Sequence, residues 1–242
     1  MVGESERGGA ERGVPSRARA ASPPSEVVAG RLAELRERIE AADRDPAGVR
    51  VVAVTKGFDD AAVATAYRVG LRDIAENHAD ELVAKASVPF DFSAELTWHL
   101  IGAIQRRKVK ALAEHVGCWQ TVSRTEEVET LARYAPQAQV FVQVDTTGLA
   151  GRNGCTPQQV PGLVSVASSS GLQVRGLMTV GPPGPPLQVR NGFELVARIG
   201  RDVGVEELSM GMSEDLDIAL RAGSTMVRVG RALFGSRPER YG

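Results

Sequence analysis

Eight short apolar segments alternate with amphipathic helical segments along nearly the whole chain. The first, Val49–Lys56, is a β-branched run that is apolar on both faces and too short for a helix. Such runs are typical of strands covered on both sides in a parallel sheet. The expected strands are 49–56, 72–76, 96–101, 118–122, 139–144, 172–178, 206–209 and 225–229. The expected helices are 26–42, 59–69, 78–85, 105–115, 125–134, 157–169, 187–203 and 216–222.

Eight strand–helix units in a chain of 242 residues predict a closed (β/α)8 barrel, an α/β fold. The helix expected before the first strand, with Ser25 as its N-cap, would cover the bottom of the barrel. An open doubly wound sheet is the alternative. It would carry a dinucleotide fingerprint after the first strand, and Lys56-Gly57-Phe58-Asp59 is not one. The barrel is therefore favoured.

Composition is that of an ordinary soluble protein. The chain is 43% hydrophobic with a formal net charge of −1, which gives no reason to expect a nucleic-acid or membrane partner. No run approaches the roughly 18 apolar residues of a membrane span. Cys118 and Cys155 have no metal-ligand or disulfide pattern and are expected to be reduced and structural. Residues 1–24, rich in Gly, Ser, Arg, Ala and Pro, predict a disordered tail before a single domain over 25–242, with the cytoplasm as the default location.

A lysine ends the first expected strand. Val52, Val54 and Lys56 share one face, so Lys56 is expected to point into the mouth of the barrel, where active sites of this fold lie. Partial loss of solvent there would favour the neutral, nucleophilic amine. The alternative is a lysine that extends its ammonium to the solvent at the rim.

The stretch from Leu208 to Gly235 suggests an anion site. A short strand, a polar turn, a helix, the turn Gly223–Thr225 and a last strand would offer backbone N–H groups and hydroxyls to a phosphate. Phosphate sites in barrels commonly follow strands seven and eight. Arg228 alternates with Val227 and Val229, so it is expected to point inward, where a cation needs a partner.

Other polar residues fall near strand ends, each a weak signal by itself. A strand-end Asn or Ser is often a helix N-cap, and His99 beside Trp98 is often a satisfied core imidazole. Their convergence on one face favours a site there. These residues are Asn77, His99, Gln105, Asp145, Asn153 and Ser209.

Several motifs together resemble the YggS/PROSC family of pyridoxal phosphate (PLP) homeostasis proteins, over about Val27 to Gly235. The motifs are Val-Ala-Val-Thr-Lys56, Glu76-Asn77, Trp98-His99-Leu-Ile-Gly102-Ala-Ile-Gln105, Gly176-Leu-Met178, Leu208-Ser-Met-Gly-Met-Ser-Glu-Asp215 and Ala222-Gly-Ser-Thr-Met-Val-Arg228-Val-Gly230. The resemblance implies the TIM barrel of the alanine racemase N-terminal domain, which is fold type III of PLP proteins.

The resemblance also implies the roles of individual residues. Lys56 would bind PLP covalently as a Schiff base, and Arg228 would donate to the pyridine nitrogen. Because a guanidinium only donates, the ring nitrogen would stay unprotonated and would be a poor electron sink. The phosphate would be held by Ser224, Thr225, Ser209 and the backbone around Gly230, while Asn77, Met210 and Met178 would lie near the ring.

Departures from the family pattern fall in loops. Ala75 stands where Gly is usual before Glu-Asn, Arg106-Arg107 follow Gln105, and Gly151-Arg152-Asn153-Gly154 follows the fifth strand. They affect the expected loop partners and leave Lys56 and Arg228 in place.

The resemblance implies a PLP carrier that takes part in PLP homeostasis and delivery to apo-enzymes without robust turnover. The alternative is a fold-type-III amino-acid racemase or decarboxylase. Racemases of this fold are similar in carrying a second domain, made of β-strands, which supplies a Tyr opposite the lysine. Here Tyr241 is the only tyrosine after the eighth unit. We therefore expect a carrier, and a monomer. A barrel that binds another phosphorylated metabolite, with Lys56 as an ion-pair donor, is a third hypothesis.

Overall fold

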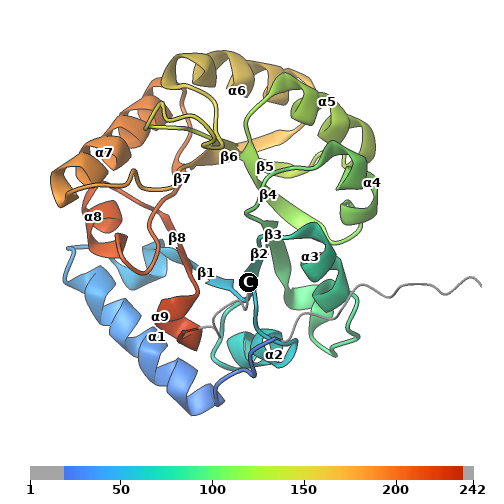
Figure 1. Cartoon of the computed structure of the whole chain (residues 1–242), viewed down its shortest axis with the longest axis vertical. Helices are drawn as coiled ribbons and strands as arrows, with labels where there is room; N and C mark the ends of the chain where they lie inside the picture. The colour runs from blue at the N-terminus through green and yellow to red at the C-terminus, as the bar shows by residue number, and fades with distance from the viewer. Residues whose placement is uncertain (1–18, 237–242) are drawn as a thin grey trace, which may run out of the picture.

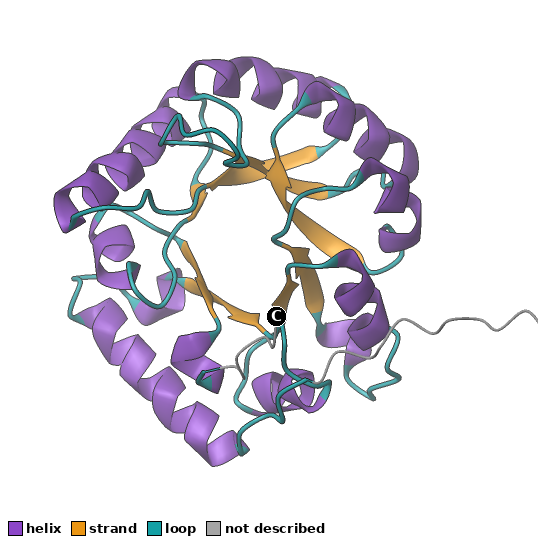
Figure 2. Cartoon of the chain, in the orientation of Figure 1, coloured by secondary structure: helices purple, strands orange, loops and turns teal. Residues whose placement is uncertain are grey.

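Eight parallel strands close into a barrel in sequence order, with β8 hydrogen-bonded back to β1. Helices form a continuous ring around the strands (Figures 1 and 2). The computed structural model describes residues 19–236. The predicted (β/α)8 barrel is confirmed.

The strands lie within two residues of their expected bounds. They are β1 (Arg50–Val54), β2 (Asp73–Glu76), β3 (Thr97–Leu100), β4 (Val116–Val122), β5 (Gln139–Gln143), β6 (Gln173–Met178), β7 (Glu207–Ser209) and β8 (Met226–Val229). The α-helices are α1 (Ser25–Glu40), α2 (Ala61–Arg68), α3 (Ala79–Ala86), α4 (Val109–Leu112), α5 (Thr125–Tyr134), α6 (Val160–Ser169), α7 (Pro186–Asp202), α8 (Leu216–Arg221) and α9 (Arg231–Phe234).

Two separate cores follow from the alternation of side chains along each strand. One face of every strand packs against the helices and contributes to a large outer core. The other face points into the barrel, where a small lumen core is formed by Val52, Val54, Ala75, Cys118, Phe141, Met178 and Met226. Cys118 and Cys155 are free and buried, as expected. The lumen core is small because polar side chains fill the rest of the barrel interior.

Helix ends account for most differences from the expected elements. Pro24 is the N-cap of α1 and no side chain caps this end, so the prediction of Ser25 as N-cap is wrong. The expected helix 105–115 is divided into a 3-10 turn, Arg106–Lys108, and the short α4. It stops early because the His115 N–H bonds Leu112 O and the next residue already belongs to β4.

The described part of the expected N-terminal tail packs on the barrel. Ala20 donates its N–H to Gly57 O at 2.9 Å and accepts the Asp59 N–H at 2.9 Å, which makes a parallel bridge with Phe58. The Ser22 N–H donates to the Asp59 carboxylate at 3.1 Å. Residues 20–22 are therefore attached to the segment that follows Lys56, while residues 1–18 lie outside the described part of the chain.

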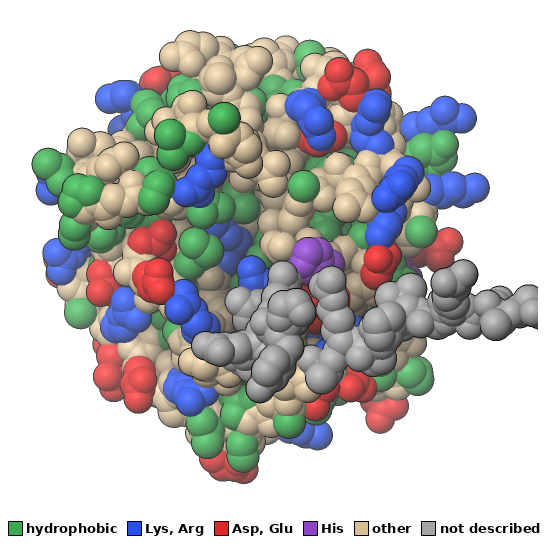
Figure 3. Space-filling view, viewed as in Figure 1, with side chains coloured by type: hydrophobic (Ala, Val, Ile, Leu, Met, Phe, Trp, Pro, Cys, Tyr) green, Lys and Arg blue, Asp and Glu red, His purple; other side chains and the backbone are tan. Residues whose placement is uncertain are grey.

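The surface is charged and mixed. Figure 3 shows Lys and Arg side chains interspersed with Asp and Glu around the outline of the molecule, in keeping with the net charge of −1. No helix within residues 19–236 is long and apolar enough to cross a membrane.

Candidate functional site

Lys56 lies at the carboxyl end of β1. It follows the strand by two residues and lies in the turn that leaves β1. Its side chain is only partly exposed. Its place at the carboxyl end of the first strand is as predicted, and the inward direction of its side chain stays a prediction.

A buried charged cluster holds both neighbours of Lys56. The Lys85 ammonium of α3 donates to Thr55 O at 2.7 Å, to Glu76 Oε1 at 2.6 Å and to Glu81 Oε1 at 3.0 Å. The Thr55 hydroxyl also donates to Glu76 Oε1, at 2.6 Å, and the Gly57 N–H donates to Glu81 Oε1 at 2.7 Å. The backbone on each side of Lys56 is thus fixed to α3.

The pKa values of the two carboxyl groups in this cluster shift in opposite directions. Glu76 and Lys85 have no exposed side-chain surface. Loss of solvent raises the pKa of Glu76 above its ordinary value and outweighs the attraction of Lys85. Burial also opposes ionisation of Glu81, but the Gly57 N–H and Lys85 together lower its pKa. Sequence analysis missed this cluster, although Glu81 and Lys85 have the i,i+4 spacing of a helical ion pair.

Arg228 points into the lumen, as predicted. Its Nη1 donates to Ser209 O at 2.6 Å and to Ser209 Oγ at 2.7 Å, and its Nη2 donates to Thr179 O at 2.8 Å. Burial lowers the pKa of Arg228 to about 10, and Asp215 acts in the opposite direction. The described hydrogen bonds of this buried cation are to neutral oxygen atoms, so the guanidinium keeps its positive charge toward the mouth.

Arg228 and Lys56 come from adjacent strands. Val52 pairs with Arg228 in the β1–β8 ladder, and Lys56 lies four residues farther along the chain, two residues past the end of β1. At about 3.3 Å per residue, about 13 Å separates the two levels along the strand. Two long side chains with one small molecule between them span such a distance.

Ser224 and Thr225 lie at the opposite rim from Lys56, so the prediction that they share a phosphate site with Lys56 is wrong. They precede β8, and the Arg50 N–H at the start of β1 bonds Thr225 O. Lys56 is six residues beyond Arg50, about 20 Å along the strand. The Ser224 hydroxyl donates to Met210 O at 2.7 Å and Thr225 Oγ1 accepts the Leu208 N–H, so both hydroxyls join β7 to β8.

The side chain of Met210 is also not where the resemblance implied. Ser209 faces the lumen through its bond to Arg228, so the next residue faces outward, and Met210 is fully buried in the outer core. Met178 does line the lumen. Ser209 also lines the lumen, and Arg228 donates both to it, at the end of β7, and to Thr179 O just after β6.

Two loops meet at the carboxyl ends of β7 and β8. The Ser213 hydroxyl accepts the Ala232 N–H at 3.1 Å, and the Met212 N–H donates to Asp215 Oδ1 at 2.6 Å. Gly230 lies beside the end of β1, where an added Cβ would be 3.1 Å from Val54 O. Gly230 was among the predicted site residues, whereas Ser213 was not, although it stands in the Leu208–Asp215 motif.

Asn77 follows β2 at the same end of the barrel. Its carbonyl group lies against Gly102, where a Cβ would be only 1.8 Å from Asn77 O. The glycine of the Trp98–Gly102 motif therefore allows the loops after β2 and β3 to touch.

The sequence profile described as "Alanine racemase, N-terminal domain" matches residues 31–238. A pyridoxal phosphate homeostasis protein of Pseudomonas aeruginosa is 37% identical over 223 residues, which cover 88% of this chain and 95% of that protein. The chain belongs to the alanine racemase N-terminal domain family, in its YggS/PROSC branch.

Solved structures agree with this assignment. PipY of Synechococcus elongatus, in a structure with PLP bound, matches the YggS/PROSC chain with a TM-score of 0.74 and 30% identity, covering 86% of this chain and all of PipY. The alanine racemase of Corynebacterium glutamicum matches with a TM-score of 0.69 at 14% identity, over 93% of this chain and 64% of the racemase. At that identity the second likeness concerns the fold alone.

Three of the remaining strand-end residues of this YggS/PROSC protein, His99, Asp145 and Asn153, have hydrogen-bond partners within the barrel or its loops. His99 bonds Asp73 and Gln120, so it is the satisfied core imidazole that the sequence left open. The Asp145 carboxylate accepts the Thr147 N–H, and Asn153 O accepts from the Gln143 side chain. Gln105 is the N-cap of the turn before α4 and its side chain is exposed. Tyr241 lies outside the described residues.

The lumen of the YggS/PROSC protein suits a small anion with a polar ring. Its mouth offers one amine, one buried guanidinium and two loops with backbone N–H groups. Within residues 19–236 no group of His, Cys, Asp and Glu is placed to hold a metal ion.

Proposed function

We propose that this protein binds PLP at the mouth of the barrel and takes part in intracellular PLP homeostasis and cofactor delivery. The observation that supports the proposal is that Arg228 points into the lumen from β8, while Lys56 follows the adjacent strand β1 by two residues. The names of the homologues support it. An amine and a guanidinium that follow from adjacent strands would match the aldehyde and the ring nitrogen of PLP.

Lys56 is proposed to hold the cofactor covalently. Its amine would attack the PLP aldehyde carbon, and the aldehyde oxygen would leave as water, giving a Schiff base. The cluster of Lys85, Glu76 and Glu81 would aid this step because it fixes the backbone of Thr55 and Gly57 and so limits the paths of the Lys56 side chain. Orientation of a reacting group in this way lowers the entropic part of a barrier.

Arg228 is proposed to donate to the ring nitrogen. A guanidinium has five N–H donors, and three hydrogen bonds from Nη1 and Nη2 leave donors for a ligand. Burial that lowers the pKa of Arg228 to about 10 still leaves the group cationic at neutral pH. PLP bound this way would have an unprotonated ring and would supply only a weak electron sink.

The phosphate is proposed to bind the backbone of 211–213 and 230–232. These loops are joined by the bond between Ser213 and Ala232, and they lie at the carboxyl ends of β7 and β8. Gly211, with a φ of 93°, turns the first loop, and a Cβ there would be 2.7 Å from the Cβ of Ala219. Phosphate sites commonly occupy this position in barrels.

Robust turnover is not expected. The lumen residues at the ends of β5 and β6, across the barrel from Lys56, are Phe141, Gln143 and Met178. None of these three is an acid or a base, so they supply no second group for proton exchange on that side. A racemase remains the alternative outcome of the experiment below.

The test is mass spectrometry of protein incubated with PLP and reduced with borohydride. We expect a pyridoxyl adduct on Lys56 and none on a Lys56→Ala protein. Lys85→Arg, which keeps a cation in α3, serves as the control for damage elsewhere. An adduct of the same yield on Lys56→Ala would contradict the proposal. Repeated exchange of the α-proton of amino acids in deuterated buffer would establish the racemase instead.

A further inference from the structure

A chain of hydrogen-bonded side chains crosses the barrel interior from Arg228, level with the middle of β1, to the amino end of β2. It begins at Arg228 and passes through Ser209, Gln120 and His99 to Asp73. The contacts are Arg228 Nη1 to Ser209 Oγ at 2.7 Å, Ser209 Oγ to Gln120 Oε1 at 2.7 Å, Gln120 Nε2 to His99 Nδ1 at 2.8 Å and His99 Nε2 to Asp73 Oδ1 at 2.8 Å. Five strands contribute one residue each.

The chain has one direction of donation, which follows from its first member. Arg228 can only donate, so Ser209 accepts from it and gives its own hydrogen to Gln120 Oε1. The Gln120 amide nitrogen therefore faces His99, whose Nδ1 must accept. His99 then carries its hydrogen on Nε2 and donates to Asp73. Contact of Gln120 Nε2 with Met226 Sδ at 3.2 Å supports the same amide orientation.

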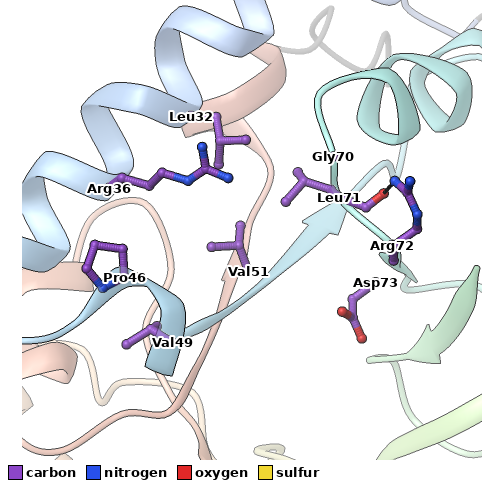
Figure 4. Close-up of a pocket in the computed structure, with 9 residues that line it drawn as sticks. All are labelled: Leu32, Arg36, Pro46, Val49, Val51, Gly70, Leu71, Arg72 and Asp73. Carbon is purple, nitrogen blue, oxygen red and sulfur yellow. Dashed lines mark hydrogen bonds between the residues drawn. The ribbon is translucent and has the colours of Figure 1, made fainter.

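Water reaches only one end of this chain. Ser209 and Gln120 have no exposed surface, His99 is 1% exposed and Arg228 3% exposed. The Asp73 side chain is 21% exposed. It lines a cavity at the amino ends of β1 and β2, and its carboxylate points away from the Arg72 guanidinium (Figure 4). A proton can therefore enter the chain from the rim opposite the cofactor site.

Asp73 is the charged partner of His99, because the other titratable groups nearby are neutral or paired elsewhere. Cys118 on β4 pairs with His99 across the strands, and burial raises the pKa of that thiol, so it stays neutral. At the same end of the lumen, Glu207 of β7 is paired with Arg50 of β1 at 3.4 Å and with Arg175 of β6 at 2.6 Å.

We propose that Asp73, His99 and Gln120 are positioning residues that orient Ser209 and Arg228 toward the cofactor, and that a proton taken up by His99 releases this orientation. The proposal rests on the proposed function for the part that concerns PLP. The chain itself is a property of the protein without cofactor.

Protonation of His99 has a defined consequence. Its Nδ1 would then carry a hydrogen and could no longer accept from Gln120, so the amide would rotate and present Oε1 to His99. Ser209 would then face the amide nitrogen, so its hydroxyl hydrogen would have no acceptor. The amide nitrogen would also lose its contact with Met226 Sδ. Buried polar groups without partners are unfavourable, so Ser209 and Arg228 would rearrange.

The first test uses the protein without PLP. Nitrogen-15 NMR of the imidazole rings at pH 8 distinguishes the two neutral tautomers, and a His99→Gln protein assigns the signal among the three histidines. We expect His99 in the Nε2–H form with a protected, slowly exchanging proton. A signal from the Nδ1–H tautomer, or from a doubly protonated ring, would overturn the proposal.

The second test is the pH profile of PLP retention, followed by absorbance and by gel filtration from pH 8 to pH 5.5. In Gln120→Glu the side chain accepts from both Ser209 and a protonated His99, so the chain persists in acid. We expect the wild-type protein to lose about threefold to tenfold more affinity on acidification than Gln120→Glu. Equal losses in the two proteins would overturn the proposal.

An Asp73→Asn protein keeps the acceptor for His99 and removes only the charge. An imidazolium is less favourable without the carboxylate, so the midpoint of the acid transition should move to lower pH. Asp80→Asn, whose exposed carboxylate bonds Lys108, is the matched control and should leave the midpoint unchanged. Equal midpoints in Asp73→Asn and wild type would overturn the proposal. Failure to bind PLP at any pH would refute the proposed function and leave the NMR result standing.

Discussion

Removal of the Lys85 charge tests how the Lys56 segment is held. A Lys85→Met substitution keeps the length of the side chain and deletes three contacts of 2.6 to 3.0 Å with Glu76, Thr55 and Glu81. It leaves two carboxyl groups facing each other in a site with no solvent at Glu76. Breaking a buried ion pair on one side costs about 3 to 5 kcal/mol of unfolding free energy. For a domain of this size the melting temperature should fall by about 6 to 20 °C.

The loss should depend on pH. The pKa of Glu81 is lowered in the folded protein, so its carboxylate contributes stability above its ordinary value of 4.5, and this contribution is lost as the pH falls through the folded value. Lys85 is one source of that lowering. The difference in unfolding free energy between wild type and Lys85→Met should therefore narrow as the pH drops below about 4.5.

Urea unfolding followed by circular dichroism at pH 7 and pH 4 gives both quantities. Lys108→Met is the matched control, because Lys108 bonds only the exposed Asp80 carboxylate, and such pairs contribute about 1 kcal/mol or less. If Lys85→Met loses no more stability at pH 7 than Lys108→Met, the buried cluster does not hold this part of the barrel.

Three further predictions concern the mouth. Gly102→Ala should lower the free energy of unfolding in urea by about 1 to 3 kcal/mol, because the new Cβ would overlap Asn77 O. A Gly102→Ala protein as stable as wild type would contradict the close approach of the two loops. Deletion of residues 1–24 removes the bridge between Ala20 and Phe58, next to Lys56, and should speed PLP release. The rate is measured by stopped-flow transfer of PLP to an apo-enzyme. An unchanged rate would show that the bridge does not slow release. Ser213→Ala should raise the dissociation constant of PLP several-fold, because it removes the bond that joins the loops after β7 and β8. Ser224→Ala should lower the free energy of unfolding without changing that constant. The opposite pattern would support a phosphate site at Ser224 and Thr225.

The barrel itself could be predicted because alternation of strand and helix is a local property. Apolar runs such as Val49–Lys56 are covered on both faces, and eight of them leave few alternatives to closure. Strand parity likewise sufficed to predict that Arg228 points into the lumen. The expected helix 105–115 was too long because the start of β4 at Val116 depends on pairing with β3, which no local pattern reveals.

The errors at the site have physical causes. Ser224 and Thr225 have the hydroxyls of a phosphate ligand, but hydroxyl groups serve equally well to join strands, and a turn before a parallel strand lies at the rim away from the site. Met210 shares a motif with Ser209, yet neighbouring strand residues face opposite layers. Lys85 was missed because its depth depends on how α3 packs over β1 and β2, and a lysine on a short helix is usually solvated.

The seam between β1 and β8 joins the beginning of the fold to its end, and the two ligands proposed for the cofactor stand on either side of it. During synthesis on the ribosome the lysine emerges among the earliest folded residues and the arginine among the last. A chain interrupted before β8 would expose the Lys56 amine without Arg228. The amine could then react with free aldehydes, but the chain could not select or retain PLP. The proposed site therefore forms only once β8 has paired with β1.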